Sequence, residues 1–138
     1  MIQLSENARK ILNARYLKKD DRGNVVETPE DMFRRVARHV AAAEKIYDWE
    51  TRPDECEERF YEIMSSLEFL PNSPTLMNAG RELGQLSACF VLPIEDNLGS
   101  IFETLKETAI IHQSGRGTSY SISNSRPKND IEATTSGN

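Results

Sequence analysis

The chain has 138 residues, which suits one domain with a moderate core. Its 38% hydrophobic and 28% charged residues are typical of a globular rather than a disordered chain. A net charge of −5 without any basic run argues against a nucleic-acid-binding surface. No apolar run approaches the roughly 20 residues that span a bilayer, and residues 1–6 lack the features of a secretory signal. Two cysteines are too few for a disulfide scaffold, so we expect a cytoplasmic protein.

The first 70 residues carry helix signals. Ser5 can cap a short helix whose apolar face is Ala8, Ile11 and Leu12, and the polar cluster 20–24 ends it. Thr28 caps a second helix, and Pro29 takes its first position. We expect the core face of this helix to be Met32, Phe33, Val36, Val40, Ala43 and Tyr47, with Arg34, Arg35 and Arg38 facing solvent.

A third helix is predicted to begin at Pro53. Its apolar positions form one stripe: Cys56, Phe60, Ile63, Met64 and Leu67. Cys56 is therefore interpreted as a small core residue rather than a redox group.

The pattern changes after Leu70. Pro71 and Pro74 bracket a polar pair, so no helix is expected to run through them. Residues 86–94 predict a buried strand, and a possible cap at Ser100 opens a helix with Ile101, Leu105, Thr108, Ala109 and His112 on one face. Residues 114–117 break that helix, and 118–123 predict a half-buried strand with Tyr120 and Ile122 on one side. Residues 127–138 are polar apart from Ile131.

The residues alone leave the chemistry open. The run from Ser114 to Thr118 can cradle a phosphate with backbone N–H groups, but a helix-terminating turn is the simpler interpretation. Cys89 reads as a buried inert cysteine, since a redox role needs an exposed thiol and a second cysteine within reach. His112 reads as a structural histidine, and no cluster has the spacing of metal ligands, so no metal site is expected.

Five motifs in this order resemble the N-terminal part of the large, catalytic subunit of ribonucleotide reductase. They are most similar to its adenosylcobalamin-dependent (class II) branch. The motifs are residues 4–8 (LSENA), 27–37 (ETPEDMFRRVA), 69–80 (FLPNSPTLMNAG), 86–93 (LSACFVLP) and 126–128 (RPK).

The resemblance implies a mainly α N-terminal helical domain, residues 1–70, followed by the first strands and helix of a ten-stranded α/β barrel, residues 71–138. It implies reduction of ribonucleotides to deoxyribonucleotides by a thiyl radical, with electrons from a cysteine pair. Adenosylcobalamin is the implied cofactor of the complete enzyme, and none is expected on this fragment alone. Implied partners are a ribonucleotide substrate, dNTP or ATP effectors, a thioredoxin-like reductant and the C-terminal remainder of the reductase, without nucleic acid or membrane.

The resemblance also implies roles for six residues. Cys89 matches a reducing cysteine, which reverses the inert interpretation of its spacing. Ser73, Ala88 and Gly117 match substrate-binding positions. Asp96 and Arg126 match the effector site, where an arginine can bind triphosphate oxygens.

Two departures from the family pattern stand out. The family's usual Gly-Gly-Gly-Thr-Gly reads GRGTS at 115–119, so Arg116 either crowds the substrate or reaches a phosphate. The usual Arg-Leu-Arg-Pro reads NSRP at 124–127.

The family's radical cysteine and second reducing cysteine have no counterpart in these 138 residues. We therefore expect an N-terminal portion that is inactive until a second polypeptide completes the barrel. The alternative is a non-catalytic module, derived from the reductase, that binds a nucleotide or a protein partner. Unpaired barrel strands at 86–94 and 118–123 would either form a homo-oligomer or be covered by the chain's own helices.

Overall fold

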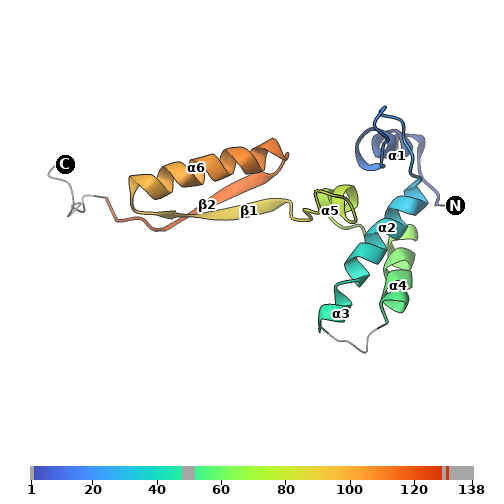
Figure 1. Cartoon of the computed structure of the whole chain (residues 1–138). Helices are drawn as coiled ribbons and strands as arrows, with labels where there is room; N and C mark the ends of the chain where they lie inside the picture. Colours follow the sequence, from blue (N-terminus) through green and yellow to red (C-terminus); the bar gives the residue numbers. More distant parts are fainter. Residues whose placement is uncertain (1, 48–51, 129, 131–138) are drawn as a thin grey trace. The chain divides into compact units, whose positions relative to one another are not determined.

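The computed structural model describes residues 2–47, 52–128 and 130. Two compact units divide it, Met1–Ser87 and Ala88–Asn138, and each is described by itself (Figure 1). The first is helical, and the second holds two strands and a helix. This confirms the predicted fold class. Ile131, the one apolar residue of the predicted polar tail, lies outside the described residues.

The N-terminal segment begins as predicted and then departs from a regular helix. The Ser5 hydroxyl accepts a hydrogen bond from the Ala8 N–H (3.2 Å) and caps α1 (Glu6–Ile11). The chain continues as a π-helical turn, η1 (Leu12–Tyr16), which the sequence did not indicate. The predicted turn follows, where the Asp20 carboxylate accepts from the backbone N–H groups of Arg22 and Asn24.

Helix α2 (Pro29–Ala41) starts with the predicted cap, completed by Asp31 as a capping box. It ends earlier than predicted, and a short α3 (Glu44–Tyr47) follows. The expected core face is right for its first three members and wrong beyond them, since Tyr47 is 85% exposed. Ala37 and Ala41 are buried instead, because these small side chains lie on the face where α2 packs against α4 (Pro53–Ser65).

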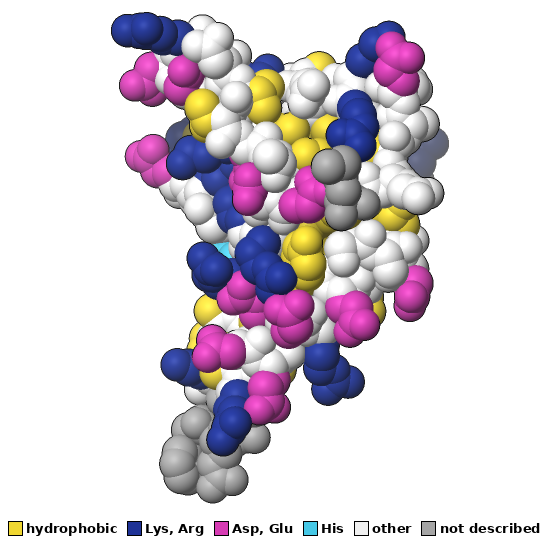
Figure 2. All heavy atoms as spheres, turned by 90° about the vertical axis from the view of Figure 1, so that its right-hand side faces the viewer, with side chains coloured by type: hydrophobic (Ala, Val, Ile, Leu, Met, Phe, Trp, Pro, Cys, Tyr) yellow, Lys and Arg dark blue, Asp and Glu magenta, His cyan; other side chains and the backbone are white. Residues whose placement is uncertain are grey.

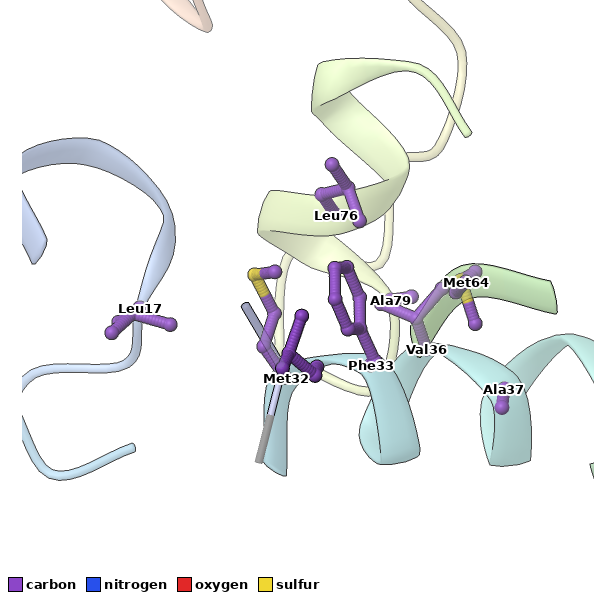
Figure 3. Packing of buried hydrophobic residues seen from close by; sticks show 9 residues of the cluster. Leu17, Met32, Phe33, Val36, Ala37, Met64, Leu76 and Ala79 are labelled. Atoms are coloured by element: carbon purple, nitrogen blue, oxygen red, sulfur yellow. The ribbon is translucent and has the colours of Figure 1, made fainter. Parts of the chain in front are cut away.

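The core of the first unit joins α2, α4 and α5 (Ser73–Asn78). Figure 3 shows Phe33 of α2 extending toward Leu76 of α5, with Met64 of α4 beside Val36. On α4, Met64 is buried and Cys56 is half-buried, but Ile63 and Leu67 are exposed, so only part of the predicted stripe faces the core.

No helix crosses the proline pair, as expected, but a short helix that the sequence did not indicate, α5, begins between the two prolines. The Asn72 carboxamide accepts from the Thr75 N–H (2.9 Å), and Pro74 sits in the first turn. Proline has no N–H to lose there and already holds the helical φ, so it starts this helix rather than preventing it.

Three charged side chains form a buried cluster, which we call the Glu27 cluster: Glu27, Arg35 and Arg81. The Glu27 carboxylate, 7% exposed, lies 2.7 Å from Arg35 Nε and 3.4 Å from Arg81 Nη2. Arg35 also donates to the carbonyls of Leu76 and Ala79 at the end of α5. The expectation that Arg35 faces solvent is therefore wrong, because its guanidinium satisfies carbonyls that a helix end leaves without partners.

The second unit is a parallel pair, β1 (Cys89–Glu95) and β2 (Gly117–Asn124), connected by α6 (Leu98–Gln113). Figure 1 shows α6 lying along the pair. The cap of α6 is Asn97, whose carboxamide accepts from the Ser100 N–H (2.8 Å); Ser100 is not the cap.

Contacts between α6 and the strands are made mainly by hydroxyls. Thr104 donates to the Pro93 carbonyl (3.0 Å), and Thr108 shares a hydrogen bond with Tyr120 (3.1 Å). The predicted apolar face of α6 is wrong apart from Thr108, since Ile101 and Leu105 are exposed. The predicted burial of 86–94, and of Tyr120 and Ile122, is also incomplete: Val91 is 70% and Ile122 66% exposed. A two-stranded sheet has few neighbours to cover its side chains.

Charge is mixed over the surface. Figure 2 shows acidic and basic side chains interspersed on one face of the molecule. Exposed ion pairs such as Arg34–Glu58 and Arg38–Glu57 join opposite charges of this kind. Among the described residues, no helix is both long and apolar enough to cross a membrane.

Replacing the buried acid of the Glu27 cluster tests what holds the first unit together. Glu27→Gln leaves two guanidinium groups facing a neutral amide, so we expect the free energy of unfolding to fall by about 3 kcal/mol. Chemical denaturation followed by helical circular dichroism measures it. Glu58→Gln, which breaks the exposed pair with Arg34, is the control and should change stability little. Equal losses in the two variants would contradict the dominant role of the cluster.

The same carboxylate predicts acid sensitivity. Burial opposes ionisation of Glu27, but hydrogen bonds from Arg35 and the Lys18 N–H, with the charges of Arg35 and Arg81, outweigh it and hold its pKa below the usual 4.5. The unfolded chain then binds the proton first as pH falls. Stability from Glu27 is therefore full above 4.5 and is lost as pH falls through the lowered pKa. Unfolding curves between pH 6 and 3 should show a shallower decline for Glu27→Gln than for the unchanged chain.

Candidate functional site

Three of the residues singled out from the sequence lie together at the start of the parallel pair. Cys89 is directly opposite Gly117 in the register, and the Gly117 N–H donates to the Ala88 carbonyl (3.2 Å). A Cβ placed on Gly117 would lie 3.2 Å from the Cys89 sulfur, tighter than ordinary contact. Glycine here lets the thiol lie closer to the backbone of β2 than a side chain at 117 would allow.

The Cys89 side chain belongs to the face of the pair that α6 does not cover. Side chains alternate along a strand, and Thr118 and Tyr120 bond to His112 and Thr108 of α6. Cys89 and its strand neighbour Val91 point the other way, and both are exposed. We call the surface of Cys89, Val91, Gly117 and Ser119 the open face. An exposed free thiol on it can form a disulfide with a second thiol when a two-electron acceptor takes up the electrons that the pair releases.

The loop after α6 has the geometry of a helix end. Ser114 caps α6, Gly115 adopts φ +75°, and the Arg116 guanidinium donates to the Ser114 carbonyl (2.7 Å). This confirms the helix-terminating turn for residues 114–116, whereas Gly117 already begins β2. His112 Nε2 lies 2.9 Å from the Thr118 hydroxyl, so this histidine has a hydrogen-bond partner within the unit.

Asp96 and Arg126 form an ion pair of 3.4 Å between the carboxylate and the guanidinium Nε. The two side chains are 36% and 34% exposed, so solvent and ligands can reach them. Nearby, the Asn124 carboxamide donates to the Glu95 carboxylate (2.8 Å). The structure thus places the two proposed effector residues in contact, although 29 residues separate their neighbours Glu95 and Asn124.

Ser73 belongs to the first unit, where it opens α5 and is exposed. Its hydroxyl lies 2.8 Å from the Tyr16 hydroxyl, across 57 residues of sequence. Sequence reasoning missed Tyr16. It falls four residues after Leu12, so periodicity assigns it to the core, and nothing local indicates a partner for its hydroxyl.

Within residues 2–47, 52–128 and 130, no three His, Cys, Asp or Glu side chains are grouped to hold a metal ion. The two cysteines, Cys56 and Cys89, are both free thiols.

Comparison with known proteins covers almost the whole chain. Residues 2–84 match the family model described as "Ribonucleotide reductase, all-alpha domain". Residues 87–138 match "Ribonucleotide reductase, barrel domain". The two compact units divide at nearly the same place, after Ser87, whereas the sequence placed the boundary at 70/71.

Curated relatives carry matching names. The vitamin B12-dependent ribonucleoside-diphosphate reductase of Thermoplasma acidophilum is 42% identical over 190 aligned positions, covering 99% of this chain and 25% of the relative. Its counterpart in Mycobacterium tuberculosis (strain CDC 1551) is 47% identical, covering 99% of this chain and 20% of the relative. Ribonucleoside-diphosphate reductase subunit alpha of Helicobacter pylori (strain 26695) is 35% identical, covering 83% and 14%.

The chain therefore spans a quarter or less of the length of these relatives. Two family domains nonetheless match it in order, and Cys89 lies near the start of the second. This confirms the resemblance seen in the sequence: the chain belongs to the ribonucleotide reductase family.

Proposed function

We propose that this chain is the N-terminal portion of a ribonucleoside-diphosphate reductase and supplies one of its two reducing thiols, Cys89. The observation that carries the proposal is the exposed Cys89 thiol close against Gly117, in a segment that matches the family's barrel domain. Replacement of a ribose hydroxyl by hydrogen releases water and takes up two electrons. Two thiols supply them and become one disulfide, with Cys89 as one partner and a cysteine of the remaining barrel as the other.

Ribonucleotide binding is proposed for Ser73, Ala88 and Gly117. The Gly117 position lacks a side chain, so a ligand can approach the backbone there. We propose that the boundary between the helical domain and the barrel lies at 70/71, because Ser73, the first of these binding residues, follows it. Helix α5, which Ser73 opens, packs in the first unit.

Adenosylcobalamin is proposed as the cofactor of the complete enzyme, because the first relatives are named vitamin B12-dependent. When bound, it would supply the radical that starts the reaction. The cobalt of adenosylcobalamin is already bound by the corrin ring and takes at most one protein ligand, and Nε2 of His112 is occupied by its hydrogen bond to Thr118. The remainder of the enzyme is therefore proposed to hold the cofactor.

Further partners belong to the same proposal. Asp96 and Arg126 would contact a dNTP or ATP effector, for which an accessible arginine offers charge-assisted hydrogen bonds. A thioredoxin-like protein would return the disulfide to two thiols, and free thiols suit the reducing cytoplasm. The exposed apolar residues of the second unit, such as Val91 and Ile122, are surfaces for the remaining barrel or for a second copy.

A reductase assay tests the proposal directly. The chain is mixed with the polypeptide that carries the rest of the barrel, adenosylcobalamin, CDP and a dithiol, and deoxycytidine diphosphate is measured. We expect turnover in the mixture and none from this chain alone. Cys89→Ser should abolish turnover, because one electron donor is lost.

Cys56→Ser is the matched control and should keep full turnover, since Cys56 is half-buried on α4 in the helical core. Product from this chain alone, or full activity in Cys89→Ser, would contradict the assignment. Nucleotide binding without turnover in the mixture would favour the non-catalytic nucleotide-binding module, and absence of both would leave only a module that binds a protein partner.

The close approach of the thiol to Gly117 gives a second test. Gly117→Ala places a methyl group 3.2 Å from the Cys89 sulfur, so one of the two must shift. We expect kcat/KM for CDP to fall about tenfold or more, because small displacements of reacting groups are costly. Ser123→Ala removes a small exposed side chain from the same strand and should leave kcat/KM unchanged. A neutral Gly117→Ala would show that this close approach is not needed.

A further inference from the structure

The hydroxyls of Tyr16 and Ser73 form a pair that the proposed function does not explain. They are 2.8 Å apart, and no other hydrogen bond shorter than 3.5 Å in the described first unit joins two hydroxyl groups from different segments. Tyr16 is the last residue of η1, and short π-helical segments occur frequently at functional sites. Core packing alone therefore does not explain the position of the Tyr16 hydroxyl.

The Tyr16 ring is held in place by apolar contacts. It packs against the core of the first unit and lines an apolar cavity of about 270 Å³ together with Leu12, Met32 and Leu76. A tyrosine has only two side-chain torsions, so a packed ring leaves its hydroxyl in one position. The polar end emerges where α5 begins, which is where Ser73 lies.

The Glu27 cluster holds the backbone on both sides of this pair. Arg81 donates to the Tyr16 carbonyl (2.7 Å) at the end of η1. Arg35 donates to the Leu76 carbonyl (3.2 Å) of α5, the helix that Ser73 opens. Because Glu27 bonds to both arginines, one buried carboxylate links the segment of Tyr16 to the helix of Ser73.

The hydrogen bond between the two hydroxyls can fix the direction in which the Ser73 hydroxyl donates. A serine hydroxyl has one proton and two lone pairs, and it rotates unless a partner fixes it. When Tyr16 donates to Ser73 Oγ, the serine proton points away and is available to an acceptor oxygen. Chains of hydrogen bonds also strengthen one another, so the serine becomes a better donor.

We propose that Tyr16 is a positioning residue of the substrate site: its hydroxyl orients Ser73 toward an oxygen of the ribonucleoside diphosphate. This inference rests on the proposed substrate role of Ser73. It makes the N-terminal helical segment part of substrate recognition rather than only a support for the barrel.

The test uses the complete reductase that contains these residues and measures KM and kcat for CDP. Tyr16→Phe keeps the ring and removes the hydroxyl, so we expect KM to rise about 3- to 10-fold, the size of one neutral hydrogen bond, with kcat and the melting temperature unchanged. Ser73→Ala should raise KM at least as much. The double variant should show no further rise beyond Ser73→Ala, because Tyr16 acts only through Ser73.

Tyr61→Phe is the matched control. It removes a hydroxyl from another half-buried tyrosine of the same unit, whose ring packs under Arg34, and KM should stay unchanged. If Ser73→Ala raises KM and Tyr16→Phe does not, the positioning role is overturned while the proposed function stands. If neither changes KM, the substrate role of Ser73 fails as well. A joint fall of kcat and melting temperature in Tyr16→Phe would make the hydroxyl purely structural and overturn the inference.

Discussion

The first unit depends on one buried negative charge. Glu27 lies in the loop before α2, and its importance comes from the two arginines with which it forms ion pairs. An isolated carboxylate at 7% exposure would be strongly unfavourable, so the arginines and the acid must stay together. Arginine suits this position because its planar fork can serve a carboxylate and carbonyl oxygens at the same time. Through Arg35 and Arg81, that single charge is linked to backbone carbonyls at the end of α5 and at the end of η1.

Local signals predicted where α1, α2 and α4 begin, whereas the start of α6 and the whole of α5 were not predicted. Ser5 and Thr28 cap the helices they precede, as predicted. Such a cap joins residues only three apart, so it can be predicted from the sequence alone. Arg35 was assigned to solvent by its helical phase, yet its partners come from the loop before the helix and from α5. The same limit applies to Tyr16, whose partner is 57 residues away. For the site, the predicted strand 86–94 contained Cys89, but Gly117 was assigned to the turn before the second strand, and only the register of β1 and β2 brings the two together.

The exposed face of the second unit follows from its topology. Residues 86–94 read as a buried strand because strands of a parallel barrel are apolar on both faces. Here α6 covers one face, and Val91 stays exposed on the other with Cys89. A parallel pair also leaves one edge of each strand without a neighbour in the described part of the chain. Apolar strand residues that stay exposed in this unit are thus what a segment of a larger α/β barrel should show. This agrees with the barrel-domain match of residues 87–138.

The departures from the family pattern have unequal consequences for the open face. Arg116 precedes β2, and its guanidinium bonds to the Ser114 carbonyl at the end of α6 (2.7 Å). The close approach of the Cys89 sulfur to β2 depends on Gly117, which the chain retains. Ser119, by contrast, pairs with Val91 and alternates onto the same side as Gly117. Its hydroxyl adds a donor and acceptor to the open face where the family usually has none. Replacement of a glycine by serine at 119, rather than by arginine at 116, therefore changes the surface beside the thiol.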